Sequence, residues 1–263
     1  MKKIIFILCA MGLFTYLFGQ DKAAFEKRSY VDANGDTLHY RILYPPKYNK
    51  NKKYPLVLFL HGAGERGYDN EAQLTHGSSL FLNAENRRKY PAIVVFPQCK
   101  PAPDYWAHMV VNEQNGVRYR EFPVMAAPKP SMKRVMELLA KLQNEEAIDQ
   151  NRLYLMGLSM GGMGTFELLS RMPNTFAAAI PICGGGNVTQ VEKYAKTTPL
   201  WIFHGDKDDV VLPEYSRQMY AALQAAGANV QYTEFPGVNH NSWDPTFKQK
   251  GLLKWLFSNK LNK

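Results

Sequence analysis

The stretch that most constrains the fold of this chain runs from Leu153 to Gly164 and reads LYLMGLSMGGMG. Its first part is a short apolar run typical of a buried strand, and its end leads into helical spacing of apolar residues. Between them, Gly157, Ser159 and Gly161 form a G-x-S-x-G motif. A serine held in a strained turn between strand and helix is typical of a nucleophile elbow. A glycine-rich connection without a catalytic role is the alternative, and the motif alone does not exclude it.

Runs typical of strands alternate with runs typical of helices along the rest of the chain. The strand-like runs are 27–32, 37–44, 56–60, 92–96, the run that begins at Leu153, 177–182, 199–203 and 230–235. The helical runs are 70–86, 131–145, the run after Ser159, 213–226 and 247–261, with Ser131 as an N-cap and Gly227 as a C-cap. This alternation predicts a single-domain α/β fold with a mostly parallel, doubly wound sheet and helices on both faces.

Two local patterns refine this prediction. Asn34-Gly35 lies between the first two strand-like runs, and Asn-Gly in that position is typical of a tight hairpin turn. Residues 100–130 are rich in proline and aromatic residues and fit neither period. A long irregular segment after a strand is typical of a substrate-binding loop or a lid.

The first nineteen residues differ from the rest. A basic start is followed by an almost unbroken apolar run from Ile4 to Phe18, which is shorter than the roughly 20 residues of a membrane span. This pattern predicts a signal peptide over residues 1–19 that is cleaved near Gly19. We therefore expect a periplasmic or secreted protein without stable membrane insertion after cleavage, and an uncleaved anchor is the alternative. The remaining residues, 20–263, carry no linker or repeat and are assigned to one domain.

Charge gives little indication of a macromolecular partner. The formal net charge of +9 falls to +7 when cleavage removes Lys2 and Lys3 and no acidic residue. The other basic residues are scattered and are not interleaved with aromatic residues. The sequence therefore predicts a solvated basic surface and no nucleic acid partner.

Cys99 and Cys183 remain after the predicted cleavage, and each follows a predicted strand. In the predicted sheet these strands are about three spacings apart, roughly 14 Å at about 4.8 Å each. A disulfide requires Cα atoms within about 7 Å of each other. We therefore expect two separate thiols.

A glycine-rich loop, 61–67, follows the apolar run 56–60 and reads HGAGERG. Its backbone N–H groups are candidates for one half of an oxyanion hole, and the N–H of Met160, directly after Ser159, is the candidate for the other half. We select Ala63 for the first donor, with Gly64 as the close competitor. His61 is expected to hold the loop by hydrogen bonds to the backbone.

Two further features of the sequence leave alternatives open. Glu65 and Arg66 either form an ion pair that braces the loop or are both solvated. Trp106 and Trp243 are candidates for substrate binding, and for Trp106 an equally good alternative is an aromatic side chain that only packs its loop against the core.

A serine nucleophile requires a base, and the base requires an acid that fixes its tautomer. His240 follows the last predicted strand and is the candidate base. Asp206, Asp208 and Asp209 follow another predicted strand and compete as the acid. His204 with these carboxylates also resembles a metal-binding set, but no other ligand in the chain converges on it, so we expect neither a metal nor another cofactor.

Four motifs together resemble the α/β-hydrolase superfamily: the loop 61–67, the motif around Ser159, His-Gly-Asp-Lys-Asp-Asp-Val-Val at 204–211 and Gly-Val-Asn-His-Asn-Ser-Trp at 237–243. Within it, the chain is similar to the secreted esterase branch that includes family-one carbohydrate esterases (feruloyl and acetylxylan esterases) and polyhydroxybutyrate-depolymerase-like esterases. In the resembled motif the acid lies four residues after the histidine, which selects Asp208, with Asp209 as the runner-up.

The resemblance implies a serine carboxylic-ester hydrolase whose residues 20–263 form the catalytic domain. Ser159, His240 and Asp208 would be the triad, and the substrate would be an ester, with acylated plant polysaccharide as the favoured class. The same motifs also resemble prolyl-oligopeptidase-like serine peptidases, so a peptidase acting on small peptides is the alternative. A binding module without catalytic activity is a third possibility, which the presence of all three triad residues disfavours.

Overall fold

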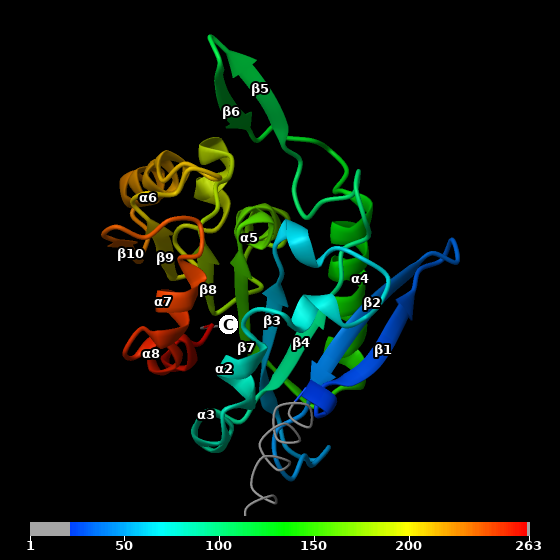
Figure 1. Cartoon of the computed structure of the whole chain (residues 1–263). Helices are drawn as coiled ribbons and strands as arrows, with labels where there is room; N and C mark the ends of the chain where they lie inside the picture. The colour runs from blue at the N-terminus through cyan, green and yellow to red at the C-terminus, as the bar shows by residue number, and fades with distance from the viewer. Residues whose placement is uncertain (1–21, 262–263) are drawn as a thin grey trace, which may run out of the picture.

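Eight strands form one twisted sheet within residues 22–261, which are the residues that the computed structural model describes (Figure 1). The strands, in sheet order, are β1 (Glu26–Val31), β2 (Thr37–Leu43), β4 (Ile93–Pro97), β3 (Tyr54–Leu60), β7 (Ile148–Leu158), β8 (Ala178–Ile182), β9 (Leu200–Gly205) and β10 (Val230–Phe235). The strands from β4 to β10 pair in parallel, and β1 and β2 add antiparallel pairs at one edge. The predicted mostly parallel sheet is confirmed. The predicted signal peptide, 1–19, lies outside the described residues.

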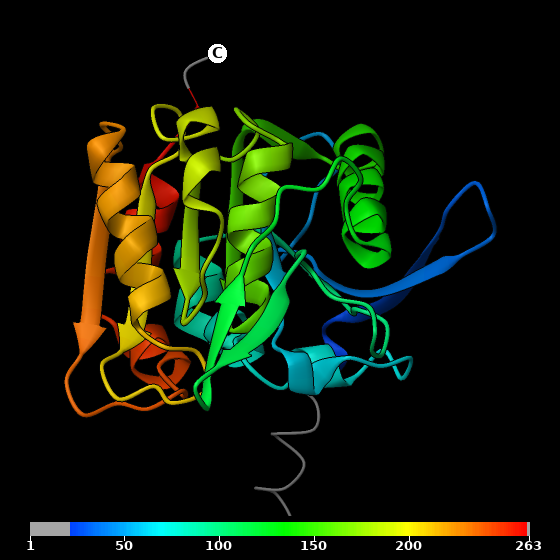
Figure 2. The same cartoon turned by 90° about the horizontal axis from the view of Figure 1, so that it is seen from above.

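Helices cover both faces of this sheet, as predicted. The α-helices are α2 (Ser78–Leu82), α3 (Ala84–Lys89), α4 (Pro130–Glu145), α5 (Met160–Arg171), α6 (Glu214–Ala225), α7 (Trp243–Lys248) and α8 (Leu252–Ser258), and the 3-10 helices are η1 (Ala63–Glu65), η2 (Ala72–Leu74) and η3 (Val188–Lys193). Apolar residues of α4, α5, η3 and α6 pack on one face, where these helices lie side by side (Figure 2). Residues of α2 and α8 pack on the other face. The strands between them are buried on both faces, which explains their continuous apolar runs.

Two predicted helices are wrong as single elements. The run 70–86 contains η2, α2 and the start of α3, because Gly77 takes a left-handed φ of 82° and Asn83 caps α3 with its side chain. The run 247–261 is divided between α7 and α8 by Gly251, with a φ of 83°. Helical spacing alone does not reveal such breaks, since a glycine inside the pattern is compatible with both outcomes.

The segment 100–130 contains a hairpin that the sequence analysis missed. Strands β5 (Val110–Gln114) and β6 (Val117–Glu121) pair around Asn115-Gly116, and both turn residues have positive φ angles of 54° and 76°. The hairpin projects beyond the sheet and its helices (Figure 1). An Asn-Gly turn was the available signal, and it is the same signal that correctly predicted the turn at Asn34-Gly35.

The predicted helix caps are partly wrong. Ser131 is not the N-cap of α4, because Pro130 is already helical and Lys129 occupies the cap position. Gly227 does end α6, with a φ of 74°. Cys99 and Cys183 are buried separate thiols, as expected. Across residues 22–261, the helices are all too short or too polar to span a bilayer.

Candidate active site

Ser159 lies in a strained turn between β7 and α5. Its φ of 53° and ψ of −116° are rarely adopted by a residue with a side chain. The flanking glycines make this turn possible: a Cβ at Gly157 would lie 2.2 Å from the carbonyl oxygen of Gly161, and a Cβ at Gly161 would lie 1.9 Å from that of Leu60. The turn therefore has the geometry of a nucleophile elbow.

His240 connects Ser159 to Asp208. Its Nε2 lies 2.9 Å from Ser159 Oγ, and its Nδ1 lies 2.8 Å from Asp208 Oδ2. Because a carboxylate only accepts, Nδ1 carries the proton and Nε2 is free to accept the serine hydroxyl proton. The His240 side chain is 20% exposed, whereas that of Asp208 is fully buried. The structure thus brings together the three side chains that the sequence selected, in the order serine, histidine, acid.

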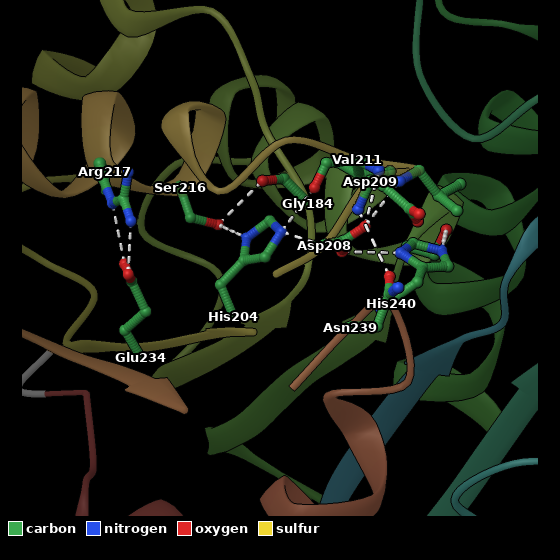
Figure 3. A network of polar contacts seen from close by, with 12 residues as sticks. Gly184, His204, Asp208, Asp209, Val211, Ser216, Arg217, Glu234, Asn239 and His240 are labelled. Carbon is green, nitrogen blue, oxygen red and sulfur yellow. Dashed lines mark hydrogen bonds and ion pairs between the residues drawn. The ribbon is translucent and has the colours of Figure 1, made fainter. Parts of the chain in front are cut away.

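Asp208 receives hydrogen bonds on both carboxylate oxygens (Figure 3). Oδ2 accepts from His240 and, at 3.1 Å, from Nε2 of His204, while Oδ1 accepts from the backbone N–H groups of Val210 and Val211. Burial by itself would raise the pKa of this carboxyl. The hydrogen bonds from the two histidines and the backbone outweigh burial and hold the pKa well below its usual value.

The two competing acids make other contacts. The Asp206 carboxylate accepts the backbone N–H of Gly237 at 2.6 Å and thereby fixes the loop that carries His240. Asp209 is exposed, and its backbone N–H lies 3.3 Å from the side-chain oxygen of Asn239. Only the carboxylate four residues after His204 reaches the ring of His240 within the described chain.

His204 is a buried residue of this site for which the sequence analysis found no structural role. Its Nε2 faces two acceptors, Asp208 Oδ2 and the carbonyl oxygen of Val211 at 2.8 Å, so Nε2 carries the proton (Figure 3). Its Nδ1 lies 2.7 Å from Ser216 Oγ, which lies 2.9 Å from the carbonyl oxygen of Gly184. The network therefore ties the acid loop to α6 and to the end of β8. Its spacing of four residues before the acid was visible in the sequence.

The two predicted oxyanion donors both begin a helical turn. Met160 is the first residue of α5 and Ala63 is the first residue of η1, so neither N–H has an intrahelical acceptor. A Cβ built on Gly62, the residue before Ala63, would lie 3.8 Å from Ser159 Cβ, which places this loop directly beside the elbow. The arrangement is compatible with the predicted oxyanion hole, whose assignment stays a prediction.

His61 holds the same loop through hydrogen bonds to the backbone, as expected. Its Nε2 accepts the backbone N–H of Cys99 at 2.9 Å, so the proton resides on Nδ1, which donates to the carbonyl oxygen of Gly62 at 2.6 Å. Burial lowers the pKa of His61 to about 4. The ring is therefore neutral near pH 7 and acts as a fixed brace for the loop.

Glu65 and Arg66 do not form the ion pair that was one of two alternatives. Arg66 donates to the carbonyl oxygens of Ala63 at 3.0 Å and Asp104 at 3.3 Å, so it braces the loop through the backbone. The Glu65 carboxylate instead lies 3.8 Å from Nε2 of His76. No role was predicted for His76, which lies in the broken helical run.

The two tryptophans predicted to bind substrate differ in their surroundings. Trp106 is fully buried, and its indole N–H donates to the carbonyl oxygen of His61 at 3.0 Å. It has no surface to offer a ligand, so the structure favours the alternative in which Trp106 packs its loop against the core. Trp243 is partly buried, and its ring lies 5.4 Å from that of His240 in an edge-on arrangement. Its predicted role in substrate binding stays open.

Cys183 lies close to the triad, and within the described residues its Sγ, a carboxylate oxygen of Asp208 and a ring nitrogen of His240 are all within 4.8 Å of one another. Such a group has the chemistry of a metal site. However, the acid and the histidine are already joined by a hydrogen bond. Burial raises the pKa of the Cys183 thiol to about 12, so the thiol stays protonated. The atoms therefore fit a hydrogen-bonded triad better than a metal centre.

Comparison with known proteins is consistent with this geometry. A family model described as Phospholipase/Carboxylesterase matches residues 47–250. A probable carboxylesterase of Arabidopsis thaliana (SOBER1-like) is 30% identical over 200 residues, which cover 70% of this chain and 72% of the relative. A bifunctional acetylxylan esterase/xylanase of Neocallimastix patriciarum (XynS20E) is 33% identical over 123 residues, which cover 43% of this chain and 18% of the relative.

A solved structure described as a thermostable esterase is also similar. It is 36% identical, and the superposition has a TM-score of 0.82 and covers 92% of this chain. The chain spans only 64% of that protein, as it spans 18% of the acetylxylan esterase/xylanase. These relatives therefore show the family and the fold, while the activity of the whole protein has to be argued from the site.

Proposed function

Because the chain belongs to the phospholipase/carboxylesterase family of α/β-hydrolases, we propose that it is a serine carboxylesterase with Ser159, His240 and Asp208 as its triad. The observation that carries this proposal is the continuous path of hydrogen bonds from Ser159 Oγ through His240 to Asp208, with distances of 2.9 and 2.8 Å. This geometry lets a neutral histidine take the serine proton as the oxygen attacks a carbonyl.

In the acylation step, Ser159 Oγ forms a bond to the ester carbonyl carbon while its proton moves to His240 Nε2. The backbone N–H groups of Met160 and Ala63 receive the developing oxyanion, and each such donor contributes about 10²–10³ to kcat in comparable enzymes. Collapse of the tetrahedral intermediate breaks the bond to the leaving alcohol, which takes the proton from His240. Asp208 keeps the His240 ring oriented and stabilises its cationic form.

Deacylation repeats these steps with water as the nucleophile. His240 takes a proton from water as it attacks the acyl-enzyme and then returns the proton to Ser159. No cofactor takes part in this sequence, since the triad and the two N–H groups supply all proton transfers and charge stabilisation.

The favoured substrate class is an acylated plant polysaccharide with acetyl or feruloyl esters. Support comes from the acetylxylan esterase activity in the name of the Neocallimastix patriciarum relative. The peptidase alternative is weaker, because the matched family model and the relative with balanced coverage are both carboxylesterases.

We also propose export from the cytoplasm, with residues 1–19 as a cleaved leader. The support is the basic start and the apolar run from Ile4 to Phe18. Cell fractionation followed by N-terminal sequencing tests this: the mature chain should begin near residue 20 in the periplasm or medium. A cytoplasmic protein that begins at Met1 contradicts it.

The experiment that tests the activity is hydrolysis by the purified mature protein, with Ser159→Ala as the control. The substrates are a short-chain aryl acetate, methyl ferulate, acetylated xylan and a proline-containing peptide anilide. We expect ester hydrolysis that Ser159→Ala abolishes. Cleavage of the anilide with inert esters would favour the peptidase, and unchanged hydrolysis by Ser159→Ala would overturn the site assignment.

A further inference from the structure

A second carboxylate lies in the loop next to the elbow, and the proposed reaction does not use it. A Cβ built on Gly62 would lie 3.0 Å from Glu65 Oε2 and 3.8 Å from Ser159 Cβ. The Glu65 carboxylate and Ser159 therefore approach the same backbone position of the oxyanion loop. The Glu65 side chain is 13% exposed, and its carboxylate oxygens are not among the unpartnered polar atoms that solvent cannot reach, so they stay accessible to a ligand.

The Glu65 carboxylate lacks the hydrogen bonds that usually accompany such burial. Among residues 22–261, its one ion-pair partner is His76, at 3.8 Å, and its two oxygens accept no hydrogen bond from a side chain or the backbone. A carboxylate has two oxygens that accept up to about four hydrogen bonds. Oxygens without a hydrogen-bond partner in the protein are free to accept hydrogen bonds from a ligand.

Two aromatic rings connect this carboxylate to the proposed base. The ring of His76 lies 5.0 Å from that of Trp243, and the ring of Trp243 lies 5.4 Å from that of His240. Trp243 is partly exposed, and in the described part of the chain its indole N–H has no acceptor. Glu65, His76 and Trp243 thus offer an acceptor, an imidazole and an aromatic face with a free N–H next to the proposed base.

The position of this group relates it to one half of the substrate. His240 donates its proton to the leaving alcohol, so a side chain that flanks the ring of His240 also flanks that alcohol. Trp243 has this position. Trp243 is therefore placed to contact the alcohol part of the ester, while the acyl part is held by the bond to Ser159.

We infer that Glu65, His76 and Trp243 form a subsite for the leaving alcohol that selects alcohols with a free hydroxyl next to the ester oxygen, as in a partly acylated sugar. The hydroxyl donates to Glu65, the carbon-bound face of the sugar ring packs on the indole, and the indole N–H is available to a sugar oxygen. The inference rests on the proposed esterase function and adds which alcohols the site prefers.

A cationic alcohol such as choline is the competing ligand, because a carboxylate and an indole also attract cations. Two observations favour the hydroxyl. The formal net charge, +9 for the full chain, stays positive after the proposed cleavage removes Lys2 and Lys3, which disfavours approach of a cation. In addition, the ring of His76 already places a basic group 3.8 Å from the Glu65 carboxylate.

The test compares two esters that differ in the hydroxyl next to the ester oxygen and carry no added bulk: the 2-O-acetate of methyl xyloside and the 2-O-acetate of methyl 3-deoxyxyloside. We expect wild-type kcat/KM to favour the hydroxylated ester by about 10- to 100-fold, since a site that binds a hydroxyl discriminates against an analogue that lacks it. In Glu65→Gln this preference should fall to less than about threefold, chiefly through a higher KM. In Trp243→Phe, which keeps an aromatic ring, it should fall less. Glu85→Gln, an exposed carboxylate on α3, is the matched control and should keep the full preference.

The outcomes separate this inference from the proposed function. Absence of hydrolysis of any ester, including an aryl acetate, would refute both. Wild-type hydrolysis of both esters at equal rates would refute the subsite alone. The subsite is also refuted if Glu65→Gln slows the two esters equally, which indicates a structural role, or if its largest loss is on a choline ester.

Discussion

Two loops of the site begin with His-Gly and carry a carboxylate four residues after the histidine. In one, His61 precedes Glu65, and in the other, His204 precedes Asp208. The Asp208 carboxylate accepts from two histidine rings and two backbone N–H groups. The Glu65 carboxylate accepts no hydrogen bond within 3.5 Å from the residues that the structure describes.

The difference arises from where each histidine ring points. Nε2 of His204 donates to the carboxylate of Asp208, which lies in the same loop (Figure 3). Both ring nitrogens of His61 instead form hydrogen bonds with the backbone of Gly62 and Cys99. The same short pattern therefore yields a saturated carboxylate that is fixed in the protein and an unsaturated one that is open to a ligand. The number of hydrogen bonds that each carboxylate accepts, more than the sequence pattern, therefore distinguishes the proposed catalytic acid from the proposed ligand-binding carboxylate.

The largest effect is expected from Asp208→Asn, which neutralises the saturated carboxylate. An amide in this place presents an N–H or an oxygen but no charge, so the His240 tautomer is lost and its cation is not stabilised. In a comparable triad this change lowers kcat by about 10⁴. We expect a similar loss in kcat with aryl acetate, measured at pH 7.

Asp209→Asn is the matched control for this variant, since it neutralises the adjacent exposed carboxylate. It should keep kcat within about threefold of the wild type, because surface substitutions away from special contacts have small effects. If Asp209→Asn causes the larger loss, the acid has been assigned to the wrong residue.

The second largest effect concerns His61 and stability. The pKa of His61 is lowered to about 4, below the usual value near 6.5, so between these values the unfolded chain binds a proton that the folded chain does not. Its contribution is complete above pH 6.5 and is lost as the pH falls toward 4, by about 3 kcal/mol.

Urea unfolding of the wild type and His61→Asn at pH 7 and pH 4.5 measures this contribution. The variant should be less stable than the wild type at pH 7, because the loop loses its brace, and the difference should shrink at pH 4.5. A difference that is the same at both pH values would show that the ring is not held neutral by burial.

A smaller effect is expected when Asp208 loses one of its two histidine donors. In His204→Phe, the Asp208 carboxylate loses one hydrogen-bond donor, so its negative charge is less compensated and attracts a proton on His240 more strongly. We expect kcat/KM to fall about 10- to 100-fold and the acid limb of its pH profile to move to higher pH, since activity needs neutral His240. His204→Gln restores an N–H donor and should recover most of both changes. A loss of activity without movement of the acid limb would indicate that His204 only supports the fold.

The sequence was sufficient for the fold and for the three residues of the candidate triad. Each of these residues follows a predicted parallel strand, and parallel strands end at one edge of the sheet, so their proximity follows from topology. The choice of Asp208 among three acids required the family resemblance. In the described chain its carboxylate contacts His240, whereas the Asp206 carboxylate accepts the N–H of Gly237.

What the sequence did not reveal depends on contacts between distant segments. Trp106 follows a strand in an aromatic-rich loop, which suggested a pocket wall, but its burial depends on how that loop packs against His61. His76 lies in a run that reads as helix until Gly77 breaks it. Its approach to Glu65 and Trp243 is set by tertiary packing, which no local period encodes.

The smallest predicted effect is on the stability of Glu65→Gln, and it completes the comparison of the two carboxylates. A carboxylate that accepts no hydrogen bond from the protein adds little to the stability of the folded state, so its neutralisation should leave the Tm unchanged or raise it by up to about 3 °C, equivalent to roughly 1 kcal/mol for a domain of this size. Differential scanning calorimetry at pH 7 measures this shift, with Glu85→Gln as the control. A fall in Tm of more than about 3 °C in Glu65→Gln would mean that the carboxylate is held by bonds within the protein, which would place Glu65 with Asp208 as a structural acceptor and leave the leaving alcohol without a partner there.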